Sequence, residues 1–400
     1  MRLYLIAGEA SGDLHGSNLI KALKRLQPAV QCRAWGGDLM QAAGATVVKH
    51  YRDLAFMGFV EVLRNIRTIY RNLAFCKQDI LDYQPDALVL IDYPGFNLRI
   101  ARWAKQQGIK VIYYISPQIW AWHQSRVHAI RRDVDKMLVI LPFEQDFFRK
   151  HGMEVEFVGH PLLDALGSEQ GTLDVGLGTL DWGLGTGDVR RWIFGPQSNV
   201  PSPTSNVQHP TSPVQHPTIA LLPGSRRQEV QRILPVMLSA VPFFPEYQFV
   251  VAGAASLQEA FYQPFLEKYG NVHLVKNQTY DLLRQAKAAL VKSGTSTLET
   301  ALFGVPQVVC YAGSPISYAI ARQVVQVKYI SLVNLILDRP LVQELIQGEL
   351  NTRNVRAALS DILLPEKAAV LQQGYDELRK KLGDGGASDR AAQAILKETG

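Results

Sequence analysis

A carboxylate at the end of a buried strand is the first candidate for chemistry in this sequence. The apolar run 87–91 ends directly in Asp92, and a Tyr-Pro-Gly sequence follows it. A carboxylate at that edge of a sheet can accept the proton of a substrate hydroxyl as a general base. The alternative is a turn-forming aspartate that accepts hydrogen bonds from the next backbone amides. The position at a strand end favours the catalytic interpretation.

A second candidate is the turn at residues 8–13, directly after the first apolar run. Its glycines allow a tight turn, and a helix that begins there presents amides to an anion or a sugar hydroxyl. The turn lacks the Gly-x-Gly-x-x-Gly pattern of dinucleotide-binding folds, which speaks against a dehydrogenase. A plain helix cap at Ser11 is the alternative. His15 and His160 have no metal-ligand spacing and are minor candidates.

Two further turns share one pattern in the second half of the chain. Ser225 and Gln228 have the spacing of a capping box, and so do Ser296 and Glu299. Both pairs follow predicted strands, so two helix N-termini are expected at one sheet edge, with Arg226 beside them. Amide donors, helix dipoles and a guanidinium suit a diphosphate. A capping box can also do no more than close its helix, but two in one domain favour anion binding.

The segment 56–75 combines an apolar stripe with a basic border. At 100° per residue its apolar side chains share one arc, and three arginines flank it. Such a helix can lie in an anionic membrane interface. Packing of the stripe on the domain core is an equally valid interpretation. The stripe consists of Phe59, Val62, Leu63, Ile66, Ile69, Tyr70 and Leu73, and the border of Arg64, Arg67 and Arg71.

Short β-branched runs alternate with helical patterns in both halves of the chain. This alternation predicts an α/β protein with two Rossmann-like domains that face a central cleft, where the strand ends would hold the ligand. Helices are expected between the strands, for example at 12–26, 97–107, 226–240 and 296–303. Strands are expected at 2–7, 87–91, 110–115, 136–140, 155–158, 218–222, 247–252, 288–292 and 307–311.

The segment 167–217 divides the two halves. It is rich in Gly, Pro, Ser and Thr, and it repeats Gly-Leu-Gly-Thr and Val-Gln-His-Pro-Thr. A composition with so little apolar surface predicts a flexible insertion. We therefore expect an N-terminal domain at 1–166 and a C-terminal domain at 218–400.

Length and composition exclude several classes of protein. With 400 residues, 47% of them hydrophobic, the chain suits two globular domains. No apolar run is long enough for a membrane-spanning helix, and the N-terminus does not resemble a signal peptide. Three unpaired cysteines favour a reducing cytoplasm without a disulfide framework or a zinc site. A net charge of +6 without a dense basic run makes nucleic-acid binding the weakest option.

The motifs together resemble those of the lipid-A-disaccharide synthase family. They occur in order along nearly the whole chain outside 167–217. The matching segments are Gly8–Gly16, Met57–Leu63, Ile91–Asn97, Ser116–Trp122, Leu141–Glu144, Val158–Pro161, Leu222–Arg226, Ser293–Glu299 and Tyr329–Leu335.

The resemblance implies a two-domain inverting glycosyltransferase of the GT-B type. It would join UDP-2,3-diacylglucosamine to 2,3-diacylglucosamine 1-phosphate, form a β-1,6-linked disaccharide and release UDP. Asp92 matches the family's catalytic carboxylate, which would take the proton of the acceptor 6-hydroxyl. The helix N-termini would replace a divalent metal, so no metal or cofactor is expected. The resemblance also implies a peripheral protein on the cytoplasmic face of the inner membrane, and a homodimer through the C-terminal domain.

The expected site residues fall into three groups. The acceptor side would hold Glu9, Ser11, Gly12, Asp13, His15 and Asn97. The UDP side would hold Ser225, Arg226, Ser293, Gly294, Thr295, Ser296, Glu299 and Asn334. The membrane-facing residues would be Phe59, Val62, Leu63, Arg64, Ile66, Arg67, Ile69 and Tyr70.

Two rival functions stay open at this point. Another UDP-sugar enzyme of the same architecture, such as a peptidoglycan glycosyltransferase or an epimerase, would share the nucleotide half. Its acceptor half would differ, and the motifs at 8–16, 57–63 and 116–122 speak against it. A non-catalytic lipid- or nucleotide-binding protein, with Asp92 as a turn residue, is the rival from another class.

Overall fold

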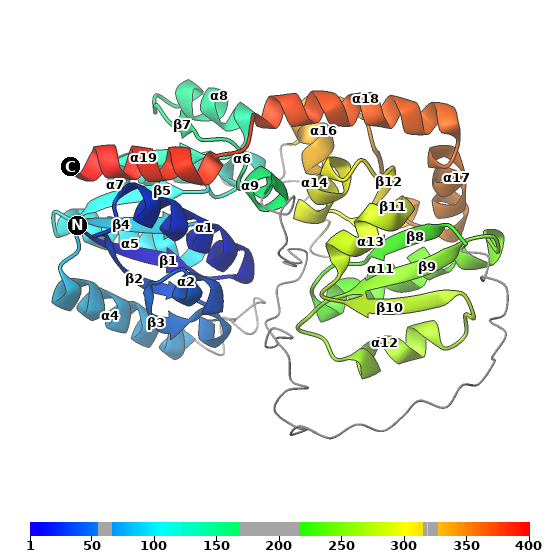
Figure 1. Cartoon of the computed structure of the whole chain (residues 1–400), viewed down its shortest axis with the longest axis horizontal. Coiled ribbons are helices and arrows are strands. Elements are labelled where there is room, and N and C mark those ends of the chain that lie inside the picture. Colours follow the sequence, from blue (N-terminus) through cyan, green and yellow to red (C-terminus); the bar gives the residue numbers. More distant parts are fainter. Residues whose placement is uncertain (55–65, 123, 168–215, 315–317, 319–326) are drawn as a thin grey trace, which may run out of the picture.

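The chain forms two parallel sheets, each covered on both faces by helices (Figure 1). The structure is a computed structural model, and it describes residues 1–54, 66–122, 124–167, 216–314, 318 and 327–400. It confirms the predicted α/β class with two Rossmann-like halves.

The first sheet has seven strands in the order β3-β2-β1-β4-β5-β6-β7. The chain begins in the middle of this sheet at β1, adds strands on one side, and then returns to add β4 on the other. The loops that follow β1 and β4 therefore meet where the strand order reverses, which is the usual ligand position in such sheets. The strands are β1 (Arg2–Ala7), β2 (Gln31–Gly36), β3 (Thr46–His50), β4 (Ala87–Ile91), β5 (Lys110–Tyr114), β6 (Lys136–Val139) and β7 (Glu156–Phe157).

Strand β1 shows why this sheet needs helices on both faces. Leu3 and Leu5 pack into one buried cluster, while Tyr4 and Ile6 point to the opposite face and pack into another. Alternating side chains that are all apolar bury only when both faces are covered. The helices of this half are α1 (Ala10–Leu26), α2 (Asp38–Ala42), α4 (Ile66–Tyr83), α5 (Pro94–Gln106), α6 (Ile119–Trp122), α7 (Val127–Asp133), α8 (Pro142–Lys150) and α9 (Pro161–Gly167), with 3₁₀ turns at Tyr51–Leu54 and Gln124–Arg126.

The second sheet repeats the same plan with six strands in the order β10-β9-β8-β11-β12-β13. Here β8 takes the place of β1, and the strand order reverses between β8 and β11. The turns after these two strands carry the serines and glycines of the two expected helix starts. The strands are β8 (Thr218–Leu222), β9 (Gln248–Gly253), β10 (Val272–Lys276), β11 (Ala286–Lys292), β12 (Gln307–Tyr311) and β13 (Gln343–Ile346).

The helices of the second half cover both faces of its sheet. One buried cluster joins them to the strands, and it also includes Trp120, Leu141 and Leu162 of the first half. The helices are α11 (Arg227–Leu238), α12 (Glu259–Leu266), α13 (Thr279–Gln285), α14 (Thr295–Leu302), α16 (Leu332–Leu337), α17 (Thr352–Ile362), α18 (Pro365–Leu382) and α19 (Ala387–Thr399), with 3₁₀ turns at Val241–Phe243 and Gln347–Glu349.

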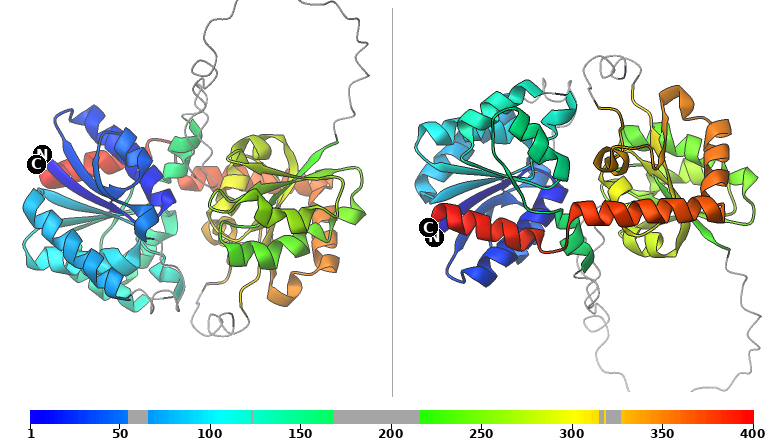
Figure 2. Two further views of the ribbon diagram at one scale, coloured as in Figure 1. Left: turned by 90° about the horizontal axis from the view of Figure 1, so that it is seen from below. Right: turned by 90° about the horizontal axis from the view of Figure 1, so that it is seen from above.

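The last helix, α19, crosses back to the first sheet and packs beside α1, so that both chain ends lie together (Figure 2). Ala391 and Ile395 join the buried cluster of the first half. Asp164 caps the helix by accepting hydrogen bonds from the amides of Ala387 at 3.0 Å and Ser388 at 2.7 Å. The expected C-terminal domain at 218–400 thus includes a helix that packs with the first half. The expected domain limits stay a prediction, because residues 168–215 lie outside the described chain.

The sequence-based prediction missed four strands, β2, β3, β10 and β13. Three of them are sheet edges, where side chains are partly exposed and no continuous apolar run is required. The fourth, β2, places Arg33 in its centre, and this side chain pairs with Asp79 of α4. A polar residue in mid-strand hides the apolar pattern on which the prediction depends.

Candidate active site

Asp92 lies in a left-handed turn directly after β4, at the reversal point of the first sheet. Asp92 has a φ of 44° and Tyr93 a φ of 50°. Left-handed backbone costs about 1–2 kcal/mol for each non-glycine residue. The Asp92 carbonyl accepts hydrogen bonds from Asn97 Nδ2 at 2.7 Å and from the Tyr113 hydroxyl at 2.6 Å. These two donors hold the turn, and with it the position of the carboxylate.

The turn after β1 comes close to the same place. A Cβ atom on Gly8 would lie 2.3 Å from the Tyr93 ring, so only glycine fits there. The Tyr93 ring stacks on Phe96, with 5.7 Å between the ring centroids. The two sheet-end turns that the sequence singles out are therefore in contact.

A second carboxylate and a distant arginine set the electrostatics around Asp92. Burial and, to a smaller extent, the negative charge of Glu9 together raise the pKa of Asp92 to about 7. Burial also raises the pKa of Glu9, whereas the charge of Arg226 lowers it. Arg226 belongs to the second half, so the electrostatic environment of Glu9 includes a charge from that half. A carboxylate that titrates near neutral pH is well suited to act as a general base.

Asn97 and Asp13 lie at this edge of the sheet, but their side chains form hydrogen bonds with backbone groups of the protein. Asn97 is fully buried below the Asp92 turn. Asp13 accepts hydrogen bonds from the amides of Gly37 at 2.7 Å, Leu39 at 3.2 Å and Met40 at 3.1 Å, and so caps α2. Both residues position the loops around the site.

The other residues of the expected acceptor side have different surroundings. Ser11 is exposed in the first turn of α1, and Glu9, not Ser11, is the N-cap of that helix. A Cβ atom on Gly12 would lie 3.1 Å from the Ala7 Cβ, so this glycine allows α1 to pack closely on β1. Burial lowers the pKa of His15 to about 4, and the nearby charge of Asp164 opposes this effect. His15 therefore lies within electrostatic reach of Asp164, which caps α19.

The two capping boxes predicted for the second half are wrong. Helix α11 begins at Arg227 with Arg226 as its N-cap, and α14 begins at Thr295 with Gly294 as its N-cap. Neither N-cap side chain accepts a hydrogen bond from its helix. The N-cap of α11 comes one residue after Ser225, and the N-cap of α14 comes two residues before Ser296, so neither serine occupies the cap position. No N-cap side chain competes with an anion at these two N-termini.

Sequence reasoning missed a group of charges between these helices. The carboxylate of Glu229, in the first turn of α11, lies 3.0 Å from Lys292 Nζ and 4.0 Å from Arg226 Nη1. Lys292 is the last residue of β11, directly before the Ser293-Gly294 turn. The sequence could have indicated this group, because Lys292 ends an apolar run directly before a glycine turn.

Glu299 is a buried carboxylate on α14. Its Oε1 atom accepts a long hydrogen bond of 3.4 Å from the Tyr280 hydroxyl. Its Oε2 atom has no hydrogen-bond partner among the described residues. Burial raises the pKa of Glu299 to about 7. A buried carboxylate oxygen without a donor favours a ligand hydroxyl as its partner.

Ser293 and Asn334 hold the loops of the second half together. The Ser293 hydroxyl donates to the Ile330 carbonyl at 2.8 Å. Asn334 Nδ2 donates to the Val342 carbonyl at 2.8 Å, and its Oδ1 accepts from the Val342 amide at 2.9 Å. Thr295 is exposed and Ser296 partly buried in the first turn of α14. Both polar atoms of the Asn334 side chain are thus already hydrogen-bonded within the protein.

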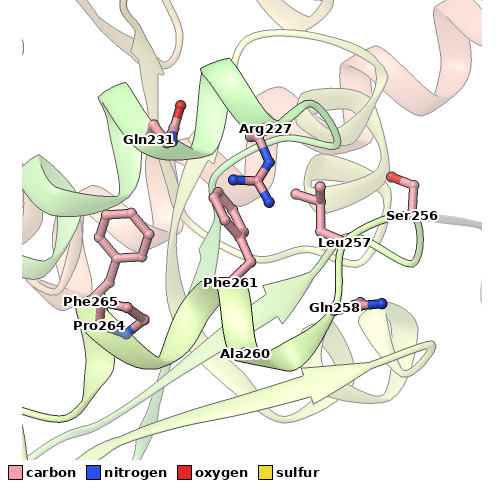
Figure 3. A pocket seen from close by; sticks show the side chains of 9 residues that line it. All are labelled: Arg227, Gln231, Ser256, Leu257, Gln258, Ala260, Phe261, Pro264 and Phe265. Atoms are coloured by element: carbon pink, nitrogen blue, oxygen red, sulfur yellow. The ribbon is translucent and has the colours of Figure 1, made fainter.

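A separate hollow of about 670 Å³ lies between α11 and α12 (Figure 3). The Arg227 guanidinium lies 4.3 Å from the centroid of the Phe261 ring. Ser256, on its rim, donates a hydrogen bond of 3.4 Å to the Ser225 carbonyl, so the hollow adjoins the turn after β8. None of the expected UDP residues lines it. Its lining consists of Arg227, Gln231, Ser256, Leu257, Gln258, Ala260, Phe261, Pro264 and Phe265.

Half of the expected membrane-facing residues can be located. Phe59, Val62, Leu63 and Arg64 lie outside the described residues, and Ile66 is the first residue of α4. Ile69 and Leu73 pack on the core of the first half. Arg67 is exposed and Tyr70 is 67% exposed on the same helix. No helix within the described parts of the chain is long and apolar enough to cross a membrane.

Comparison with known proteins decides the family. A family model for lipid-A-disaccharide synthetase matches residues 3–175 and 201–397. The chain belongs to this family. The lipid-A-disaccharide synthase of Syntrophus aciditrophicus is 40% identical over 402 residues, which are 98% of this chain and 96% of that protein. The synthase of Geobacter metallireducens is 38% identical, covering 100% of this chain and 97% of that protein. The chain is thus a glycosyltransferase with a role in lipid A disaccharide synthesis.

Solved structures agree with the fold of the family. UDP-GlcNAc 2-epimerase from Neisseria meningitidis, bound to UDP-GlcNAc, superposes with a TM-score of 0.65 at 13% identity, covering 99% of this chain and all of that one. The glycotransferase of kitacinnamycin gives a TM-score of 0.61 at 14% identity over 100% of this chain and 99% of that one. At this identity the likeness shows the GT-B-type architecture and no more.

Proposed function

We propose that this glycosyltransferase joins UDP-2,3-diacylglucosamine to 2,3-diacylglucosamine 1-phosphate and releases UDP. The observation that carries the proposal is Asp92, a carboxylate with a pKa near 7, held in a strained turn near Glu9 at the reversal point of the first sheet. Strained backbone that the surrounding structure stabilises is typical of functional sites.

Asp92 acts as the general base of this reaction. The 6-hydroxyl oxygen of the acceptor forms a bond to the anomeric carbon while its proton passes to the Asp92 carboxylate. The bond between the anomeric carbon and the β-phosphate oxygen breaks, and its electron pair stays on UDP. Attack from the face opposite UDP inverts the anomeric centre.

The second half binds the nucleotide. The diphosphate lies at the N-termini of α11 and α14, which have no side-chain caps, with Arg226 beside it. The orphan oxygen of Glu299 accepts a hydrogen bond from a ribose hydroxyl. Within the described chain, no three His, Cys, Asp or Glu side chains are grouped so as to hold a metal ion.

Release of UDP tests the reaction directly. Purified protein should release UDP from UDP-2,3-diacylglucosamine only when 2,3-diacylglucosamine 1-phosphate is present. An epimerase would instead convert UDP-GlcNAc without an acceptor, and a pure binding protein would bind UDP without turnover. Either of these results from folded protein would contradict the proposal.

The rate should depend on pH through Asp92. The base must be deprotonated, so kcat/KM should fall about tenfold per pH unit below about 7 and level off above it. In the Glu9→Gln variant the neighbouring negative charge is gone, which lowers the pKa of Asp92. The acidic limb of the profile should therefore move to lower pH. An exposed control, Glu154→Gln, should leave the profile unchanged. An unmoved limb in Glu9→Gln would contradict the coupling of the two carboxylates.

We also propose that the exposed face of α4 binds an anionic membrane surface, as a peripheral contact on the cytoplasmic side. Arg67, Tyr70 and Arg71 are exposed there. A basic residue near an anionic surface contributes about 1 kcal/mol to binding. The double variant Arg67→Glu/Arg71→Glu should reduce binding to vesicles with anionic lipid at least about tenfold in a sedimentation assay. Arg353→Glu, on α17, is the control for charge alone. Equal losses in both proteins would contradict this surface.

The homodimer through the C-terminal domain stays a prediction. Sedimentation velocity of the full chain over a range of concentrations would test it.

A further inference from the structure

Lys292 is a charged side chain at the nucleotide end of the second sheet to which the proposed reaction assigns no part. It ends β11, the strand next to the reversal point, and its side chain is 24% exposed. A Cβ atom on Gly294 would lie 3.8 Å from Lys292 Nζ. The ammonium therefore lies over the N-cap of α14, where an anion would also meet the helix dipole.

Glu229 holds this ammonium in place. Its Oε1 atom is 3.0 Å from Lys292 Nζ and 4.0 Å from Arg226 Nη1. A Cβ atom on Gly224 would lie 2.6 Å from Glu229 Oε2, so the glycine turn leaves room for the carboxylate. Gly224 has a φ of 106°, which a side chain rarely adopts. The glycine in the turn after β8 thus allows the Glu229 carboxylate to lie against the backbone.

Glu229, Lys292 and Arg226 form a group with one more cation than a single ion pair needs. Two cations share one carboxylate oxygen, so Glu229 does not neutralise both of them. A partly exposed pair contributes little to stability. Fixed cations that surround the place where charge develops are, in contrast, an effective way to stabilise a transition state.

We infer that Lys292 is a further catalytic residue, whose ammonium contacts the diphosphate of UDP and stabilises the departing β-phosphate oxygen. Glu229 is a positioning residue that acts through Lys292 and Arg226. This inference rests on the proposed function. As the bond from the anomeric carbon breaks, its electron pair moves to that oxygen, and the acceptor proton passes to Asp92. The contact with Lys292 strengthens as the charge grows, so it lowers the barrier more than it tightens binding.

The test compares nucleotides that differ in their phosphates. In Lys292→Met, calorimetry should show the Kd of UDP raised about 10- to 100-fold, the range for hydrogen bonds to charged groups. The Kd of uridine should change less than about twofold. With the lipid substrates, kcat should fall about 100- to 1000-fold, and Lys292→Arg should restore part of it. Lys287→Met, at the other end of β11, is the matched control and should change none of these values.

Each outcome separates the inference from the proposed reaction. Equal losses of UDP and uridine affinity, or no loss of either, would overturn the role of Lys292. UDP binding needs no acceptor, so a wild type that binds UDP without turnover would sink the reaction, while the nucleotide comparison would still test the phosphate contact. Unchanged melting temperatures in Lys292→Met and Lys292→Arg would exclude a folding defect as the cause.

Discussion

Asp92→Asn should lower kcat by about 100- to 10,000-fold, which is the usual contribution of a general base. The amide has the shape of the carboxylate but cannot accept the proton of the acceptor hydroxyl. The backbone of the turn should stay intact, because Asn97 and Tyr113 bond to the carbonyl of residue 92 and not to its side chain. UDP affinity should therefore stay within about twofold of the wild type, since Asp92 lies on the opposite half of the molecule.

Acceptor-dependent UDP release and calorimetry with UDP measure these two quantities on the same preparations. The matched control is Asp146→Asn, an exposed aspartate on α8, which should keep full activity. Retained activity in Asp92→Asn would show that another group takes the proton. A parallel loss of UDP affinity would show instead that the substitution disturbs the fold.

Asn97→Asp should have the second large effect, although Asn97 touches no substrate in the proposed mechanism. Asn97 Nδ2 lies 2.7 Å from the carbonyl oxygen of Asp92, and 3.3 and 3.4 Å from those of Ile91 and Ile6. The residue is fully buried. A carboxylate in its place would face three carbonyl oxygens without a donor, at a cost of about 3–5 kcal/mol. The melting temperature should fall by several degrees.

The same substitution should reduce kcat of the folded protein by about 100-fold, since a misplaced catalytic group loses about that much. The KM for the sugar nucleotide should change little. Asn18→Asp, a partly buried position on α1, controls for the added charge. Wild-type thermal stability and rate in Asn97→Asp would contradict the positioning role of this amide.

The strand-end residues could be predicted from the sequence because a buried strand and the turn after it are local. The run 87–91 predicted β4 and with it the place of Asp92. The runs 2–7 and 218–222 predicted β1 and β8 in the same way, within the predicted α/β class. An apolar run, followed by glycine and a polar residue, predicts a strand and the turn after it from a few neighbouring residues. The family motifs predicted the lipid-A-disaccharide synthase family on the same local evidence.

Only the tertiary structure decided which of these ends meet. The order of the strands places β1 beside β4 and β8 beside β11, although long segments separate them in the chain. The pairing of Glu229 with Lys292 follows from that order, whereas the interaction of Glu9 with Arg226 depends on the packing of the two halves against each other. The raised pKa of Asp92 depends on burial by distant segments. Segments far apart in the sequence determine which charges pair and how deeply a carboxylate is buried. A local sequence pattern therefore cannot predict either property.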